Sequence, residues 1–486
     1  MRLDHTRTPY ADAVRAYGDR SLVRMNTPGH QVQLQAHSDL ADFFGHDILA
    51  RDVQPFVDGI DYGTYPTPLD ESLELAADAW GARKTWFLTN GASKGNLMAC
   101  LATRNLGTKI VVQRSVHSSV IDGLGLTGFD AEFVYPSVDK ELGIANGVTP
   151  AALELAIQCS GSPVAAYVVT PSYFGAVADV SALADVAHSH GIPLIVDEAW
   201  GAHFGFHPEL PANAIRLGAD IVISSTHKLA GSLTQSAMLH LGHGEFSDVL
   251  EPLLDRAFKS LQSTSASALL TASLDIARKE IVTRGPESIP ATLECMTALR
   301  EGIASDGRFY DIAAHLMTFD DVIDIDPLRI ALNTLSGGIS GHEARSILFN
   351  DFGVHCEIAT HSTLVLLVGA GATPDVERTL AALHALPLRA DGAGIALELP
   401  PAGQRVSIVR DAYFAKTEVV SAAQAVGRVS ADSVAAYPPG IPNLLPGERI
   451  SAETIAFLQG TIAQPYGHVR GGASPDMTQF RVVAEP

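Results

Sequence analysis

From about Tyr65 to Leu241, short apolar runs alternate with amphipathic stretches. The runs are predicted strands, because they are brief, rich in β-branched residues and bounded by turn residues: 85–89, 109–113, 164–170, 194–197 and 221–224. Apolar residues at helical spacing predict helices between them, for example over 69–80 and 180–189. Continuous apolar strands that alternate with helices indicate a mostly parallel α/β sheet with both faces covered.

The pattern becomes purely helical over residues 245–305, which predicts a helical connection out of this sheet domain. A second α/β unit is expected beyond Asp311, with strands at 328–332 and 363–368, helices at 342–349 and 374–385, and a Gly- and Pro-rich connection at 387–403. We therefore expect an N-terminal segment (1–60), a large domain (61–310) and a small C-terminal domain (311–486).

Composition narrows the class of protein. Of the 486 residues, 47% are apolar and 18% charged, which excludes a disordered chain. The 33 basic residues against 54 acidic ones give a net charge of −21, which disfavours nucleic acid and anionic membranes as partners. No apolar run approaches the roughly 20 residues that span a bilayer, and the charged N-terminus lacks a signal-peptide core, so a cytoplasmic location is expected.

Cysteine and histidine spacing gives no sign of a metal site or a disulfide framework. The four cysteines are far apart and form no CxxC pair. His203 and His207 are four residues apart, but Pro208 breaks the helix that a shared metal site would need. The GxGxxG match at residues 123–128 follows no strand and is predicted to be a loop.

A turn of small residues, Asn90 to Asn96 (NGASKGN), joins a predicted strand to an apolar helix. Such a turn lets backbone amides approach an anion, and Ser93 could add a hydroxyl donor to a phosphate. The same residues match G-x-S-x-G, the nucleophile elbow of serine hydrolases, which also lies between a strand and a helix. An ordinary helix N-cap is the third interpretation.

Three further polar residues follow predicted strands closely. Asp197 ends the strand at 194–197, where open α/β sheets bind ligands, although Asp also caps strands without any function. Lys228 follows the strand at 221–224 within Ser-Ser-Thr-His-Lys, a setting that suits Schiff-base chemistry better than a plain surface lysine. His117, just past the strand at 109–113, is either a site residue or an ordinary loop histidine.

Together these segments resemble the ornithine/lysine/arginine decarboxylases that use pyridoxal 5′-phosphate (PLP) in the aspartate-aminotransferase-like fold, in the short form without an N-terminal wing domain. The resemblance rests on spaced motifs over most of the chain: TPGH at 27–30, TNGASKGN, RSVHSSV, VDEAWGAHF, STHKLAGSLTQSA, QSTSASALL and AAYPPGIPNLLPGE. It implies a large domain with a mostly parallel sheet and a smaller C-terminal α/β domain.

Carried over position by position, the resemblance assigns roles to individual residues. Lys228 corresponds to the lysine bonded to PLP, Asp197 to the partner of the pyridine nitrogen, and His117 to the ring that stacks on the cofactor. Further cofactor contacts are implied for Ala92, Ser93, Lys94, Ala199, Trp200, Ser225 and His227. Ser263 and Thr264 correspond to residues that reach the cofactor of a neighbouring subunit, which implies a homodimer with active sites at its interface.

The chain departs from the family pattern at several positions. Members commonly have Thr at 92, Thr or Ala at 94, and a basic residue after PGH, where this chain has Ala92, Lys94 and Gln31. The family's usual Asp-Glu-Ala-His is Asp-Glu-Ala-Trp here, with Trp200 in place of the histidine, as in some members. Residues 59–68 (GIDYGTYPTP) stand where members usually have a segment like LDDLHxP.

The implied activity is decarboxylation of a basic amino acid, lysine, ornithine or arginine, to the corresponding amine. Asp197 would keep the pyridine nitrogen charged, and His227 or Lys228 would return a proton to Cα. An aminotransferase or lyase of the same fold is the alternative. A serine hydrolase with Ser93, Asp197 and His227 is a further alternative, but it gives Lys228 no role. A non-catalytic protein would give none of these polar residues a role.

Overall fold

The computed structural model describes residues 3–33, 35, 37–389, 400–437, 441–464 and 467–485. The chain divides into two compact units. Unit 1 comprises Met1–Ala99, Glu198–Ile289 and Gly369–Gly371, and unit 2 comprises Cys100–Asp197, Pro290–Val368 and Ala372–Pro486. Most of the predicted connection at 387–403 lies outside the described residues, because 390–399 fall in a gap.

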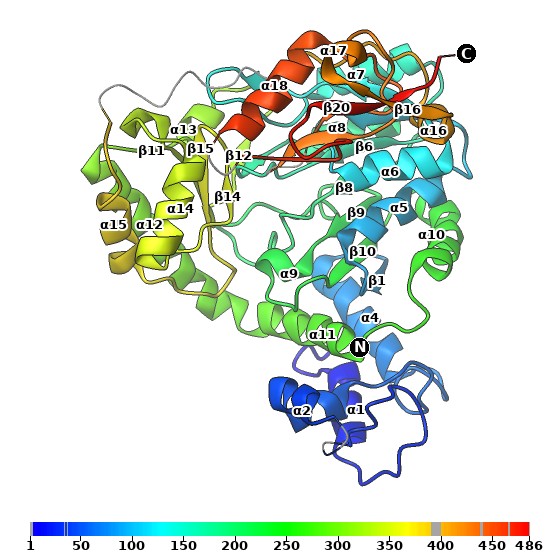
Figure 1. Ribbon diagram of the computed structural model, residues 1–486. Coiled ribbons are helices and arrows are strands. Elements are labelled where there is room, and N and C mark those ends of the chain that lie inside the picture. Colours follow the sequence, from blue (N-terminus) through cyan, green and yellow to red (C-terminus); the bar gives the residue numbers. More distant parts are fainter. Residues whose placement is uncertain are drawn as a thin grey trace. The chain divides into compact units, whose positions relative to one another are not determined.

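Seven strands form the main sheet, in the order β1-β10-β9-β8-β6-β2-β3. Their bounds are β1 Lys84–Leu88, β2 Lys109–Gln113, β3 Asp130–Val134, β6 Ala166–Val169, β8 Leu194–Asp197, β9 Ile221–Ser224 and β10 Ala237–Leu241. In unit 2, β2 runs parallel to β3 and β6, and β6 runs parallel to β8, so the predicted parallel sheet is confirmed. In unit 1, β10 is antiparallel to both β1 and β9 (Figure 1).

The helices of unit 1 differ in how they begin, and only some of them have a side-chain cap. They are α1 Pro9–Gly18, α2 Ser38–Phe44, α3 His46–Arg51, α4 Pro68–Trp80, α9 Thr226–Leu229, α10 Ser247–Leu261, α11 Ala268–Thr283 and the start of α5 Gly91–Thr103. In α4, Thr67 and Asp70 form a reciprocal capping box, and Gly81 ends the helix in the left-handed conformation. The apolar face of α4, including Trp80, is buried in the core of unit 1.

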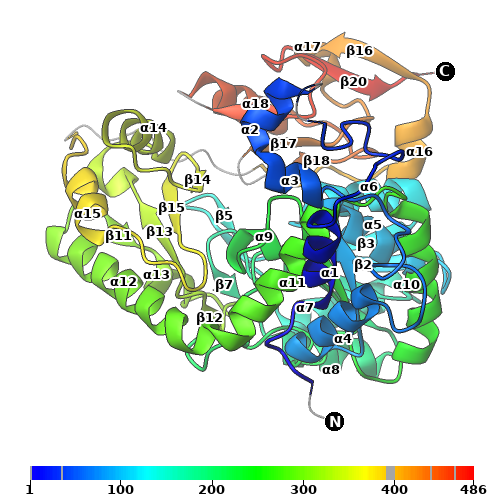
Figure 2. The ribbon, with the colours of Figure 1, turned by 90° about the horizontal axis from the view of Figure 1, so that it is seen from below.

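The amino end of unit 1 is bound to α11 by two buried charges, and α1 and α11 lie side by side in both views (Figures 1 and 2). Asp275 Oδ2 accepts the backbone N–H groups of Tyr10 and Ala11, at 3.1 and 3.3 Å. A carboxylate there neutralises the positive end of the α1 dipole. Arg278, which pairs with Asp275 at 2.6 Å, donates to the backbone oxygens of residues 5 and 7.

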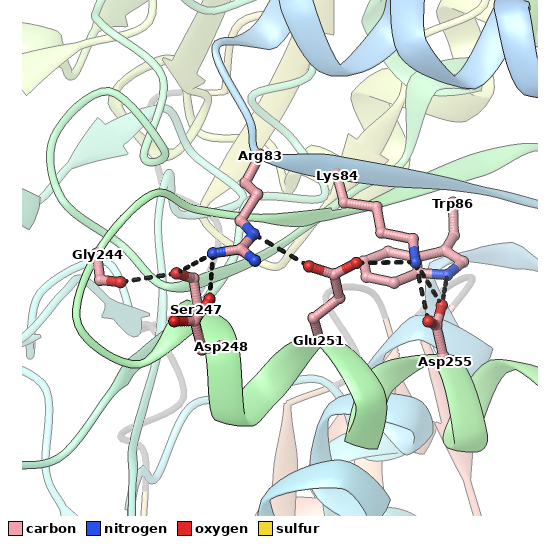
Figure 3. A network of polar contacts seen from close by, with 8 residues as sticks. All are labelled: Arg83, Lys84, Trp86, Gly244, Ser247, Asp248, Glu251 and Asp255. Atoms are coloured by element: carbon pink, nitrogen blue, oxygen red, sulfur yellow. Dashed lines mark hydrogen bonds and ion pairs between the residues drawn. The ribbon is translucent and has the colours of Figure 1, made fainter.

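Charged side chains fix α10 beside the edge strand β1 (Figure 3). Arg83 pairs with Asp248 at 2.7 Å and with Glu251 at 3.0 Å. Lys84 pairs with Glu251 at 3.2 Å and with Asp255 at 2.9 Å. This network ties α10 to the residues at the start of β1, the outermost strand of the sheet.

Unit 2 adds helices to its part of the main sheet and carries several smaller sheets. Its helices are α6 Ser118–Thr127, α7 Pro150–Ser160, α8 Val180–Ser189, α12 Gly285–Asp306 (which begins in unit 1), α13 Ala313–Leu316, α14 Gly341–Phe352, α15 Val376–His384, α16 Val409–Phe414, α17 Ala422–Ala425 and α18 Ala452–Ala463. No helix in the described ranges is both long and apolar enough to cross a membrane.

Unit 2 also contains a four-stranded sheet in the order β11-β13-β15-β14, where β13 pairs antiparallel with β15. These strands are β11 Tyr310–Asp311, β13 Arg329–Asn333, β14 Ile358–Ala359 and β15 Thr363–Leu367. The remaining strands are β4 Val138–Asp139, β5 Ile144–Ala145, β7 Ala176–Val177, β12 Asp324–Ile325, β16 Thr417–Ser421, β17 Val434–Tyr437, β18 Pro442–Leu444, β19 His468–Arg470 and β20 Gln479–Val483.

The loop prediction for the GxGxxG match at 123–128 is wrong. Residues 123–127 belong to α6, and Gly128 ends that helix in the left-handed conformation. The apolar residues Val120, Ile121 and Leu124 are buried, so packing overrides the low helix propensity of glycine. Gly125 lies where α6 packs against α16, and a Cβ on it would be 3.4 Å from the side chain of Val409, an ordinary contact distance.

Candidate active site

The first turn of α5 contains three residues of the predicted cofactor site. Gly91 begins the helix with φ of +80°, a conformation that other residues rarely adopt. Ala92, Ser93 and Lys94 follow, with Ser93 exposed and the other two partly buried. Since the first backbone N–H groups of a helix have no partner within it, this turn can bind an anion such as phosphate.

Gly95 brings this turn of α5 very close to the sheet. A Cβ at position 95 would lie 2.8 Å from Cγ2 of Ile223 in β9 and 3.0 Å from Cδ1 of Leu88 in β1. Only glycine allows an approach this close without displacing its neighbours. The anion-binding turn is therefore held near the end of β9, the strand that leads to Lys228.

The Ser-Thr-Ser segment lies against the residues that precede α5. Asn90 Oδ1 accepts the backbone N–H of Ser263 at 3.0 Å, and Gln262 Nε2 donates to Thr89 Oγ1 at 2.9 Å. Ser263 and Thr264 are exposed. Within one chain, the structure thus brings the predicted in-trans residues to the beginning of the anion-binding turn, where their side chains face solvent.

Lys228 lies in the short helix α9, which follows β9 after a single residue. Ser225 and Thr226 are buried, and the backbone N–H of Lys228 donates to the Ser225 oxygen at 2.9 Å. The carbonyl of Leu229, the last residue of α9, accepts from the N–H of Ala370 at 2.9 Å. The backbone that carries the lysine is thus fixed at both ends of the turn.

His227 has a defined tautomer. Its Nδ1 lies 2.8 Å from the backbone oxygen of Ser236, and a carbonyl can only accept, so Nδ1 carries a proton. Any proton that His227 exchanges with a substrate must therefore pass through Nε2. A serine-protease triad has a carboxylate on Nδ1 of its histidine, so this hydrogen bond does not support the serine-hydrolase alternative.

Trp200 and Lys228 are in direct contact. The Nζ atom of Lys228 lies 3.7 Å from the centroid of the Trp200 ring. Trp200 is buried, and Ala199 before it is partly buried. The two predicted cofactor residues therefore belong to the same cluster as the predicted catalytic lysine.

Glu198 anchors the turn that carries Trp200. Its backbone N–H donates to the oxygen of Ile223 at 2.9 Å, and its Oε1 accepts from the N–H of Ala214 at 2.8 Å. Burial raises the pKa of Glu198 well above its usual range, which favours the neutral carboxylic acid. A Cβ on Gly201 would lie 2.6 Å from Cγ of Glu198, so the turn is tight.

Asp197 lies in unit 2, as the last residue of β8, and is buried. It is opposite Val169 in the parallel pair β6–β8, and its backbone oxygen accepts from the N–H of Thr170 at 3.2 Å. The pKa of Tyr167 lies well above its usual range, mainly because its side chain is buried and, to a smaller extent, because of the nearby charge of Asp197. Asp197 thus places a negative charge at the carboxyl end of a buried strand, as predicted.

His117, also in unit 2, is the N-cap of α6. Its Nδ1 accepts the backbone N–H of Ser119 at 3.2 Å and lies 2.8 Å from Ser119 Oγ. Nδ1 therefore has no proton, and the neutral ring carries its proton on Nε2. Capping also fixes the ring relative to the start of α6.

Within unit 1 the structure gathers Ala92, Ser93 and Lys94 on one turn, and Ala199, Trp200, Ser225, His227 and Lys228 around another. Asp197 and His117 belong to unit 2. Three residues that sequence reasoning missed are Asn90, Glu198 and Gln262. Glu198 directly follows Asp197 at the end of an apolar strand, and this position could have identified it from the sequence. The contacts of Asn90 and Gln262 depend on segments far away in the sequence.

The chain matches two family models. The one described as Orn/Lys/Arg decarboxylase, major domain, covers residues 8–350, and the one described as Orn/Lys/Arg decarboxylase, C-terminal domain, covers residues 401–464. The chain is 32% identical to an arginine decarboxylase of Bacillus anthracis, over 100% of this chain and 99% of the relative. It is 23% identical to the constitutive lysine decarboxylase of Escherichia coli (strain K12), over 94% of this chain and 77% of the relative.

Solved structures share the fold. The lysine decarboxylase LdcF of Francisella novicida superposes with a TM-score of 0.80 at 18% identity, covering 98% of this chain and 81% of that one. A serine palmitoyltransferase from S. paucimobilis with bound PLP gives a TM-score of 0.50 at 18% identity, covering 74% of this chain and 84% of that one. These likenesses confirm the predicted fold class.

Proposed function

The chain belongs to the Orn/Lys/Arg decarboxylase family and is an amino-acid decarboxylase, and we propose that it uses PLP to decarboxylate arginine. The products would be CO₂ and the corresponding guanidino amine. Four relatives named arginine decarboxylase are 31–33% identical over at least 90% of this chain. Two lysine decarboxylases and the biodegradative arginine decarboxylase of Escherichia coli (strain K12) are 23% identical. The four more similar relatives support arginine as the substrate.

The described residues of unit 1 fit a phosphorylated aldehyde. The first turn of α5 offers backbone N–H groups to a phosphate, and Gly95 keeps that turn against β9, where a Cβ would collide with Ile223. Lys228 offers a primary amine to the aldehyde, and Ser225, three residues earlier, offers a hydroxyl. This combination, an amine just after β9 and an anion-binding turn packed on β9, is the observation that carries the proposal.

Bound PLP would supply the electron sink that stabilises the negative charge left on Cα when CO₂ departs. Asp197 would keep the pyridine nitrogen protonated, because a buried carboxylate favours a cation beside it. His117 would stack on the ring. The proton that returns to Cα would come from His227 through Nε2, the nitrogen that does not bond the Ser236 oxygen, or from Lys228.

The exposed Ser263 and Thr264 support a homodimeric enzyme. Their backbone is held at Asn90 of the same chain, and their side chains face solvent, where a second subunit can meet them. Each would complete the phosphate site of the neighbouring subunit. Sedimentation of the purified protein at equilibrium should therefore give twice the mass of one chain, or a multiple of it.

The direct test of the proposed function is an assay with arginine, lysine and ornithine in parallel, in which released CO₂ and product amine are both measured. Arginine should react fastest. Borohydride reduction followed by peptide mass spectrometry should place a pyridoxyl mass on Lys228, and Lys228→Ala should abolish both the mass and the visible absorbance. Lys259→Ala, at an exposed position, is the matched control and should change neither. Turnover that requires an amino-group acceptor would make the protein an aminotransferase.

A further inference from the structure

The contact between Trp200 and Lys228 is unusually close for a cation over a ring. Nζ lies 3.7 Å from the ring centroid, whereas Lys84 lies 5.1 Å from the centroid of Trp86. Trp200 is only 8% exposed, so little water screens the pair. The attraction between a cation and the face of an indole is larger at such desolvated sites than at the protein surface.

Both residues are positioned by backbone contacts. The turn that carries Trp200 is anchored by Glu198, whose N–H donates to Ile223 of β9. Lys228 lies in α9, which follows the same strand. Its backbone N–H donates to the Ser225 oxygen, and this bond fixes the backbone from which the lysine side chain extends. Because both anchors are on or next to β9, the geometry of the ring and the amine is set by the fold of unit 1.

We propose that Trp200 is a positioning residue that holds the side-chain amine of Lys228, as the ammonium ion, whenever that amine is not bonded to the cofactor. The inference rests on the proposed function, in which the substrate amine replaces Lys228 on the aldehyde carbon. In that exchange the double bond from the carbon to Nζ would be replaced by a double bond to the substrate nitrogen, and all the protons that the substrate ammonium loses would pass to Nζ, which becomes an ammonium ion. A ring that favours the ammonium over the neutral amine favours release of Lys228 and keeps it in one place.

The test measures acylation of Lys228 in the cofactor-free full chain, prepared with hydroxylamine and dialysis. Acetic anhydride reacts only with neutral amines, and mass spectrometry of peptides gives the rate at Lys228 relative to the exposed Lys259. Trp200→Leu removes the ring face, and Trp200→Phe keeps a weaker one. Trp86→Phe, which alters the Lys84–Trp86 pair, is the matched control.

At pH 8, Lys228 should be acylated about threefold to tenfold faster in Trp200→Leu than in the wild type. The rate in Trp200→Phe should lie between these two, and the rate in Trp86→Phe should equal that of the wild type. The pH profile of the Lys228 rate should shift to lower pH in the same order. A rate increase that is equal at every pH would mean that the mutation only exposes the lysine, and equal rates in all variants would mean that the ring does not act on it. Either outcome overturns the proposal.

The proposed function is tested separately by the pyridoxyl mass on Lys228 in the wild-type protein. If that mass is present and the acylation rates do not differ, only the role of Trp200 is wrong. If the mass is absent, the proposed function fails, whatever the acylation rates show.

Discussion

Arg114, just after β2, donates to both carboxylate oxygens of Glu448 at 3.1 and 3.2 Å, although the two residues are 334 positions apart. Both are buried, with side-chain exposures of 7% and 4%. Removing one partner of a buried pair leaves the other charge uncompensated. Glu448→Gln should therefore lower the free energy of unfolding by about 3–5 kcal/mol, as measured by urea denaturation.

The control for this prediction is the half-exposed pair of Arg405 and Asp130, 2.8 Å apart in the same unit. Asp130→Asn should cost about 1 kcal/mol or less, because solvent screens such pairs. Similar losses in both variants would show that burial does not decide the contribution of the Arg114–Glu448 pair.

Gly95→Ala should destabilise the protein, although alanine is normally the better helix former. The added Cβ would meet Ile223 at 2.8 Å and Leu88 at 3.0 Å, so α5 must move away from the sheet. We expect a net loss of about 1–3 kcal/mol and weaker PLP binding, measured by urea denaturation and by titration of the cofactor-free protein. Gly244→Ala, where the nearest atom is 3.6 Å away, is the control and should change neither quantity. Wild-type stability in Gly95→Ala would contradict the close packing.

His240 should make the stability of unit 1 sensitive to acid. It lies between hydroxyls of Thr85 and Ser224, at 2.8 and 3.2 Å, and burial lowers its pKa from 6.5 to about 3. The unfolded chain therefore takes up a proton below pH 6.5 that the folded chain takes up only near pH 3. The free energy of unfolding should fall over this window by up to about 1.4 kcal/mol per pH unit.

Comparison with His240→Gln isolates this contribution. The stability difference between wild type and variant should be constant above pH 7 and should shrink as the pH falls below 6.5. His243→Asn, at an exposed position, should follow the wild type throughout. A difference that does not change with pH would show that His240 is not held neutral.

A mutation can separate the roles of the two ring nitrogens of His227. Asparagine at this position places an amide N–H near Nδ1 and can keep the bond to the Ser236 oxygen, but it has nothing at the Nε2 position. His227→Asn should therefore keep wild-type stability and cofactor absorbance while kcat with arginine falls about 100-fold or more. Nearly unchanged turnover would assign the proton transfer to Lys228 instead.

The local pattern of residues predicted the strands that position the site. The strands β2, β8 and β9 have the predicted bounds, because each is an uninterrupted apolar run ended by a polar residue. The same pattern placed Asp197 at the carboxyl end of β8 and Lys228 just after β9. Such positions follow from local sequence alone.

Contacts between distant segments could not be predicted in this way. Asn90 accepts from Ser263 across 173 positions, and nothing in either segment indicates the other. The pair of Trp200 and Lys228 depends on two turns being held at one strand. The glycines of α6 misled for a related reason, because the packing that makes this segment helical involves residues far along the chain, such as Val409.

The buried pair of Asp275 and Arg278 has a consequence for proteolysis. Neither side chain has any exposed surface, and both bind main-chain groups of residues 5–11. A protease that cuts just after Ala11 would release those groups and leave two charges without their backbone partners inside α11. Digestion at the amino end should thus proceed to fragments of unit 1 rather than stop at a shortened, stable chain.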